Sequence, residues 1–235
     1  MAEAAAVEEK RGGPALPLLL LFASPPFLFT LVAFLFYFGT MLAAPLVVYP
    51  PVAGEMFGDY GGTGPGGLPS GPVPSYVPEQ IAYKPVDAAG EQAVIAWLAA
   101  RGSALADEAH MQALDAAGKR WNVDPLLLLA ITGQEQSFVP KRYSDWSMVE
   151  KNPFNVFGSW IRYHPGFDVS AMWAASTVAR LSRNCPPGVS VIQWINGFGA
   201  DGFRDNPAWG YAGDPNWWVG VSRFYSQLQE IAKGK

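Results

Sequence analysis

The hydrophobic pattern changes abruptly along the chain, and its first part is a long apolar run. Residues 15–49 contain no charged residue and consist largely of Leu, Phe, Ala and Val. A helix of roughly 20 apolar residues spans a bilayer. Pro25 and Pro26 break the run, so the spanning helix is expected at residues 27–48. A signal peptide has an apolar run of only about 7 to 15 residues before its cleavage site, which favours an uncleaved transmembrane anchor over residues 15–49.

The positive charges around this anchor predict its orientation. Lys10 and Arg11 precede the apolar run, and the next Lys or Arg after it is Lys84. Lys and Arg are enriched on the cytoplasmic side of membrane spans. We therefore expect a cytoplasmic tail at residues 1–14, a single pass through the cell membrane, and an extracytoplasmic location for the rest of the chain.

The second part of the chain has the composition of a linker. Residues 50–78 are dense in Gly and Pro, and such a segment buries too little apolar surface to fold by itself. Mixed Gly and Pro content gives a partly extended tether. We predict a linker over residues 50–84, which separates the anchor from the domain that follows.

The third part, residues 85–235, places apolar residues at helical spacing and shows little strand-like alternation. It therefore predicts a mainly α-helical domain. Expected helix starts are Asp87, Ser103, Asp124 with Pro125 at the first helical position, Asp168, Gly188 and Asp214. The expected helices cover residues 87–101, 103–121, 125–136, 169–183, 189–196 and 215–233.

Charge and chemistry narrow the classes of function. The formal net charge of −4 and the lack of basic runs argue against nucleic acid as a partner. The single cysteine, Cys185, has no partner for an internal disulfide. His110 and His164 have no Cys or acidic neighbours at metal-ligand spacing. We expect neither a metal nor another cofactor.

Glu135 is the candidate that stands out by its surroundings. It lies near the end of an expected helix that is otherwise mostly apolar, and it shares a face with Leu128 and Thr132 through i, i+4 and i+7 spacing. An apolar environment and the negative end of the helix dipole both disfavour the charged carboxylate. Both effects raise the pKa, as a general acid requires. A Glu that merely emerges at a frayed helix end is the alternative, and spacing does not separate the two.

Three segments carry a family resemblance. Residues 123–138 have the sequence VDPLLLLAITGQEQSF, in which an aromatic residue follows Glu135 three residues later. This segment resembles the catalytic helix of lysozyme-like peptidoglycan-cleaving enzymes. Residues 151–160, KNPFNVFGSW, and 211–225, YAGDPNWWVGVSRFY, resemble an Asn-rich aromatic segment and a Tyr-Ala-x-Asp-Pro-Asn-Tyr segment of one branch. That branch is the bacterial endo-β-N-acetylglucosaminidases, similar to mannosyl-glycoprotein endo-β-N-acetylglucosaminidase. The resemblance covers residues 105–230, although Gln136 stands where many members have Ser.

The resemblance implies a lysozyme-like domain and assigns roles to residues. Glu135 would be the general acid, and Tyr211 a catalytic residue across the cleft near the scissile bond. Expected substrate-binding residues are Phe138, Asn155, Phe157 and Trp160. The alternative for aromatic residues on expected helices, Trp173, Trp194, Trp217 and Trp218, is that most belong to the core. The substrate would be the glycan strands of peptidoglycan.

One departure from the family leaves the reaction open. The branch usually carries a hairpin after Phe-Gly that brings a second carboxylate, but here nine residues separate Gly158 from Asp168. Candidates for a second carboxylate are Asp145, Glu150, Asp168 and Asp201, although Asp168 and Asp214 are better explained as helix caps. Hydrolysis by an endo-β-N-acetylglucosaminidase is our first expectation. A lytic transglycosylase that uses Glu135 alone is the alternative, and a non-catalytic peptidoglycan-binding module is a third.

Overall fold

The computed structural model describes residues 67–73, 75–199, 201–206 and 210–234. The expected cytoplasmic tail and transmembrane anchor lie outside these residues. Within the described ranges, no helix combines the length and the apolar character that crossing a membrane requires. The chain divides into two units at Pro50, and the second unit, Pro51–Lys235, holds everything described below.

The described part of the second unit is mainly α-helical, as the sequence predicts. Its helices are α4 (Ala88–Ala99), α5 (Glu108–Trp121), α6 (Pro125–Gln136), α7 (Trp146–Val149), α8 (Phe167–Leu181), α9 (Val191–Ile195) and α10 (Trp217–Ala232), with a 3-10 helix η1 (Val156–Gly158). Only isolated bridges, Ser103 with Pro140 and Phe198 with Arg204, represent β structure among the described residues. The short elements α7 and η1 were not expected from the sequence.

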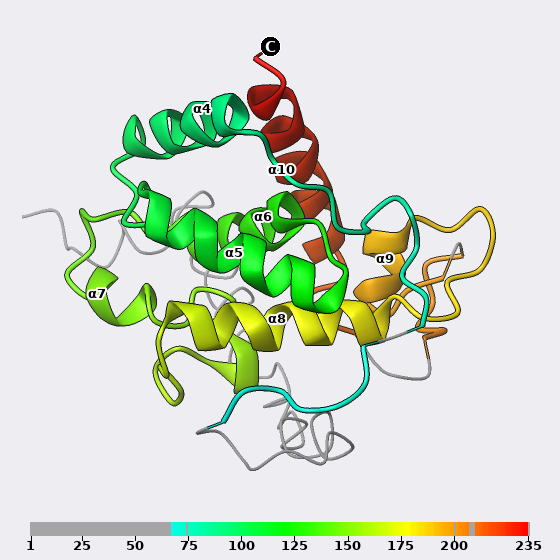
Figure 1. The fold of residues 1–235 in the computed structure, drawn as a ribbon. Helices are drawn as coiled ribbons and strands as arrows, with labels where there is room; N and C mark the ends of the chain where they lie inside the picture. The colour runs from blue at the N-terminus through cyan, green and yellow to red at the C-terminus, as the bar shows by residue number, and fades with distance from the viewer. Residues whose placement is uncertain (1–66, 74, 200, 207–209, 235) are drawn as a thin grey trace, which may run out of the picture. The chain divides into compact units, whose positions relative to one another are not determined.

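Helix α6 is the centre of the core. It packs against α5, α8 and α10 (Figure 1), and every residue from 125 to 133 is buried. A helix that is apolar all round is stable only when it is covered on all sides. The predicted start is confirmed, since Asp124 accepts a hydrogen bond of 2.8 Å from the backbone N–H of Leu126 and Pro125 follows it.

The end of the predicted linker packs against this core. Ile81 is buried, and its carbonyl accepts from the backbone N–H of Asp124 at 2.8 Å. The hydroxyl of Tyr225, on α10, donates to Asp124 Oδ2 at 2.6 Å and lies 3.2 Å from the carbonyl oxygen of Gln80. Residues 80 and 81, which lie inside the predicted linker, therefore contact the helical domain.

Four expected helix starts are wrong. Helix α9 begins at Val191 and its cap position is Ser190, not Gly188. Helix α5 begins at Glu108, and its cap is Asp107, which accepts from the backbone N–H of His110 at 3.0 Å, because Ser103 is engaged elsewhere. Helix α8 begins one residue before Asp168, so that carboxylate lies in its first turn. Asp214 accepts from the N–H of Asn216 at 2.9 Å and forms a turn that precedes α10.

Helix α4 belongs to the same packed unit. Its predicted cap is confirmed, since Asp87 accepts from the N–H of Gly90 at 2.8 Å. The helix packs against α10 (Figure 1), so closely that a Cβ atom at Gly90 would lie 2.6 Å from the carbonyl oxygen of Ala232. Trp97 meets the ring of Phe138 edge-on, with centroids 5.0 Å apart. Helix α4 therefore supports the segment that follows α6.

The contact between Tyr225 and Asp124 gives a stability prediction. Asp124 is 3% exposed, and Tyr225→Phe removes a donor from its buried carboxylate. The variant should lose about 1–3 kcal/mol of unfolding free energy, measured by chemical denaturation of the full chain. Tyr76→Phe is the control, because Tyr76 is exposed. Equal, small losses in both variants would contradict the structural role of this hydrogen bond.

Candidate active site

Glu135 stands where the buried helix α6 reaches the surface. It is the last residue but one of the helix and is half-buried, directly after the fully buried stretch. Burial penalises the charged carboxylate and raises the pKa of Glu135 above its ordinary value. The direction expected from the sequence is thus confirmed, and burial is its main cause.

Two N–H donors hold the carboxylate in one orientation. The indole Nε1–H of Trp217 donates to Oε1 of Glu135 at 2.6 Å, and the amide of Asn155 donates to Oε2 at 2.7 Å. Both bonds favour the charged form and lower the pKa, but the effect of burial is larger. Asn155 Oδ1 accepts from the backbone N–H of Trp160 at 3.3 Å, which turns the amide nitrogen toward Glu135.

The loop that carries Asn155 is fixed by a second, buried asparagine. The side chain of Asn152 donates to the carbonyls of Val156 and Tyr163 at 2.9 and 2.8 Å and accepts from the N–H of Val156 at 3.1 Å. Asn155 itself has a φ of 52°, a left-handed conformation that Asn adopts more readily than most residues. The asparagines of this segment therefore stabilise the backbone of the loop, and Asn155 also donates a hydrogen bond to the Glu135 carboxylate.

Tyr211 supports the site through Trp217. Their rings stack with centroids 4.8 Å apart at an interplanar angle of 18°, and the Tyr211 hydroxyl donates to the carbonyl of Phe154 at 3.1 Å. Burial, followed by the nearby negative charge of Glu135, holds the pKa of Tyr211 well above its ordinary value. Tyr211 is therefore near Glu135, and the raised pKa keeps its phenol protonated at neutral pH.

Directly after Gln136, the last residue of α6, the backbone turns left-handed for three residues. Ser137, Phe138 and Val139 have φ values of 50°, 62° and 54°, a conformation that costs roughly 1–2 kcal/mol per residue. The Ser103 hydroxyl donates to the carbonyl of Phe138, and the N–H of Ala104 donates to that of Val139 at 2.8 Å. Strain of this kind persists only where the surroundings enforce it, and it clusters at functional sites.

Phe138 is a core residue, so its expected contact with substrate is wrong. Its side chain is only 3% exposed, because the left-handed turn directs the ring back onto α6 between Trp97 and Phe224, each 5.0 Å away between centroids. A Cβ atom at Gly133 would clash with this ring. Phe138 thus anchors the turn that follows Glu135.

The two other aromatic candidates have different positions. Phe157 is half-buried and meets Tyr163 and Trp173 edge-on at centroid distances of 4.8 and 4.9 Å, which makes it a support for the Asn155 loop. Trp160 is half-buried and lines a pocket of about 230 Å³ beside α7. Of these two side chains, only Trp160 lines this pocket, so it is the better candidate for a contact with substrate.

Three of the four candidate second carboxylates are engaged elsewhere or lie on a helix. Glu150 lies 3.0 Å from Nε2 of His110, whose Nδ1 is 2.7 Å from Asp107. Asp201 accepts from the N–H of Phe203 at 3.0 Å and turns the chain. Asp168 is in the first turn of α8, whereas Asp145 lines the same pocket as Trp160. The described residues contain no His, Cys, Asp and Glu cluster suited to a metal ion.

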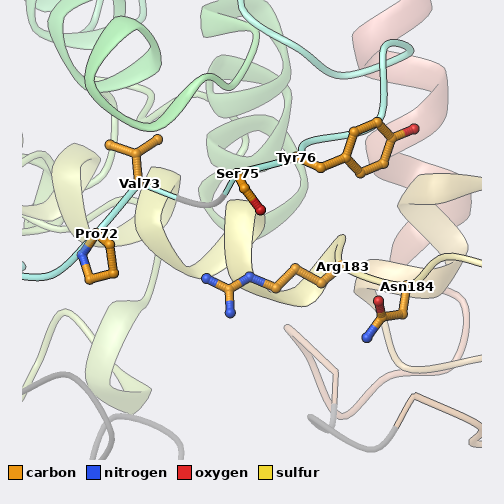
Figure 2. A pocket seen from close by; sticks show the side chains of 6 residues that line it. All are labelled: Pro72, Val73, Ser75, Tyr76, Arg183 and Asn184. Carbon is orange, nitrogen blue, oxygen red and sulfur yellow. The ribbon is translucent and has the colours of Figure 1, made fainter.

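A second pocket, of about 370 Å³, lies between residues 72, 73, 75 and 76 on one side and the residues that follow α8 on the other (Figure 2). Its lining residues are Pro72, Val73, Ser75, Tyr76, Arg183 and Asn184. None of them is a candidate from the sequence, and none contacts Glu135 through a hydrogen bond that the structure records.

Trp217 is the site residue that sequence reasoning missed. Its position on an expected helix predicts a core residue, and Trp217 is buried, but its indole N–H donates to Glu135. The available signal was its place at the end of the YAGDPNW segment, where the resembling family has Tyr. Periodicity alone cannot tell a core indole from one that donates to a carboxylate.

Compared with models of known protein families, with curated proteins and with solved structures, the chain matches none of them.

The paired donors on Glu135 give a prediction about its ionisation. Trp217→Phe removes one N–H that favours the carboxylate, so the pKa of Glu135 should rise further above its ordinary value. Carbon-13 NMR titration of the labelled Glu carboxyls, with Glu135→Gln to assign the signal, measures this pKa. Trp218→Phe changes the neighbouring indole and should leave the titration unchanged. A lower pKa in Trp217→Phe would contradict the described geometry.

The left-handed turn gives a second prediction. Ser137 is exposed and has a positive φ, which glycine adopts without the steric cost. Ser137→Gly should therefore raise the free energy of unfolding by about 1 kcal/mol, measured by chemical denaturation. Ser147→Gly, at an exposed position inside α7, should lower it instead. Destabilisation by both changes would argue against strain at Ser137.

Proposed function

We propose that this protein is a membrane-anchored enzyme that cleaves the glycan strands of peptidoglycan, with Glu135 as its general acid. The proposal combines the three motif resemblances with the environment of Glu135. The observation that carries it is a half-buried carboxyl group with a raised pKa, held by the side chains of Asn155 and Trp217. All three of these residues lie in the segments that resemble the endo-β-N-acetylglucosaminidases.

The environment of Glu135 suits proton transfer to a glycosidic oxygen. A general acid works best when its pKa lies near the operating pH, and burial moves the pKa of Glu135 in that direction. In hydrolysis, Glu135 gives its proton to the bridging oxygen and the bond from that oxygen to C1 of the sugar breaks. Water then adds to C1 and gives its extra proton to solvent. The two N–H donors then stabilise the carboxylate that remains.

The first choice of reaction is endo-β-N-acetylglucosaminidase hydrolysis of a β-1,4 bond. The runner-up is a lytic transglycosylase, in which Glu135 acts first as acid and then as base while the muramic acid's own 6-hydroxyl attacks C1. The partners of the Glu135 carboxylate favour keeping this alternative, because both are N–H donors and neither is a second carboxyl group. Two-carboxylate glycosidases place a second acid at a defined separation.

The proposed setting is the outer side of the cell membrane. Residues 15–49 would anchor the chain, and residues 1–14 would lie in the cytoplasm. A lysozyme-like domain, residues 85–235 with the packed segment before it, would then reach the wall over a short tether. The anchor limits cleavage to nearby strands, which suits local opening of the wall for turnover or for passage of an envelope-spanning machine or a virus.

The product identifies the reaction. The full chain, solubilised in mild detergent, is incubated with purified peptidoglycan, and mass spectrometry analyses the released fragments. Reducing N-acetylglucosamine ends are expected for the hydrolase, whereas 1,6-anhydro-muramic ends establish the transglycosylase. Glu135→Gln should reduce release by at least about 100-fold, the lower range for loss of a general acid, while Glu79→Gln, at an exposed position, should not.

Failure of the proposal has a clear signature. A folded protein that releases no fragments, and that binds wall sacculi equally well with and without Glu135→Gln, would be the non-catalytic binding module. Fragment release that persists in Glu135→Gln would contradict the assigned acid.

A further inference from the structure

The imidazole of His110 lies between two carboxylates that come from different parts of the fold. Its Nδ1 is 2.7 Å from Oδ1 of Asp107, the cap of α5, and its Nε2 is 3.0 Å from Oε1 of Glu150, which directly follows α7. The side chain of His110 is only 11% exposed, and the ring of Phe167, on α8, meets it edge-on with centroids 4.5 Å apart. We call the contacts of His110 with Asp107 and Glu150 the His110 clamp.

The geometry of the His110 clamp fits a protonated ring. An ionised carboxylate only accepts hydrogen bonds, and a neutral imidazole donates from one of its two nitrogens. Both contacts are therefore hydrogen bonds only when His110 is positively charged. Burial raises the pKa of Asp107, but hydrogen bonds from the backbone and the ring of His110 outweigh burial, so this pKa lies below its ordinary value. Apart from the two carboxylates, the group that faces His110 is the uncharged ring of Phe167, on α8.

Glu150 leads directly into the loop that holds the Glu135 carboxyl group. Two residues later, the buried side chain of Asn152 fixes this loop through three hydrogen bonds to its backbone. In the same loop, Asn155 donates to Glu135 at 2.7 Å. The His110 clamp therefore ties the start of this loop to the first turn of α5.

The ring of Phe167 connects His110 to the same loop a second time. Phe167 packs against Phe154 with 5.5 Å between the ring centroids. Phe154 is fully buried and directly precedes Asn155, and its carbonyl accepts from the hydroxyl of Tyr211 at 3.1 Å. His110 thus supports the loop both at Glu150 and, through Phe167, next to Asn155.

We propose that protonated His110 is a positioning residue, which holds the loop of Asn155 in place and thereby keeps the Asn155 amide on the Glu135 carboxyl group. The effect on the reaction rests on the proposed function, whereas the clamp itself does not. Histidine is the side chain that ordinarily changes its charge between about pH 5 and 8. The contribution of the clamp is present while the ring is charged, and it is lost as the pH rises and the ring releases its proton. The hold on Glu135 therefore weakens from about pH 5 to about pH 8.

Amide hydrogen exchange of the detergent-solubilised full chain measures the His110 clamp without any substrate. After correction for the intrinsic exchange rate, residues 151–163 of the wild type should be about two- to fivefold better protected at about pH 5 than at about pH 8, the range for a partly exposed ion pair. His110→Gln is neutral at every pH and should remove this difference, and Glu150→Gln should reduce it. His164→Gln, which changes the other histidine of the chain at an exposed position, should keep it. Equal protection at both pH values in the wild type, or an unchanged difference in His110→Gln and Glu150→Gln, would overturn the clamp.

Fragment release from peptidoglycan by the same proteins separates the His110 clamp from the proposed function. The wild type should release about two- to fivefold more than His110→Gln at about pH 5, and the ratio should approach one at about pH 8, where the wild-type ring is neutral too. A ratio that is the same at both pH values indicates a purely structural role and would overturn the positioning role. A pH-dependent difference in protection without Glu135-dependent release would overturn the proposed function and leave the clamp standing. Circular dichroism verifies folding, and Glu150→Gln decides the question if His110→Gln does not fold.

Discussion

One constraint organises the structure: a helix that is buried on all sides carries a carboxylic acid in its last turn. Helix α6 contributes an unbroken buried stretch at residues 125–133 and ends at Gln136. Glu135 therefore lies within one helical turn of the buried stretch. Burying a carboxyl group is costly unless hydrogen bonds compensate. Glu135 resolves this conflict with two N–H donors at 2.6 and 2.7 Å and still retains a raised pKa.

Three other segments of the chain hold the Glu135 carboxyl group or the turn that follows it. Helix α10 begins with Trp217, which Tyr211 stacks upon and which reaches Oε1. The loop before η1 brings Asn155, whose position depends on the buried Asn152. The segment after α4 enforces the left-handed turn that follows Glu135. Segments far apart in the sequence thus meet at one group, which is the organisation expected of a preorganised catalytic site.

The features that depend on residues close together in the sequence are predicted correctly. The mainly helical class, the caps at Asp87 and Asp124 and the raised pKa of Glu135 follow from short-range patterns, and the structure agrees. Sequence reasoning failed where tertiary contacts decide. Ser103 has the chemistry of a helix cap but is engaged by the carbonyl of Phe138, and Phe138 turns inward because of three positive φ angles that no residue type there signals.

The central claim is that Glu135 meets a glycosidic oxygen of peptidoglycan. A crystal structure of the full chain carrying Glu135→Gln, with a bound N-acetylglucosamine and N-acetylmuramic acid tetrasaccharide, tests it most directly. We expect a β-1,4 bridging oxygen within about 2.6–3.2 Å of the side chain at position 135, close to Asn155 and Trp217. A saccharide bound away from position 135, with these two side chains untouched, would contradict the account.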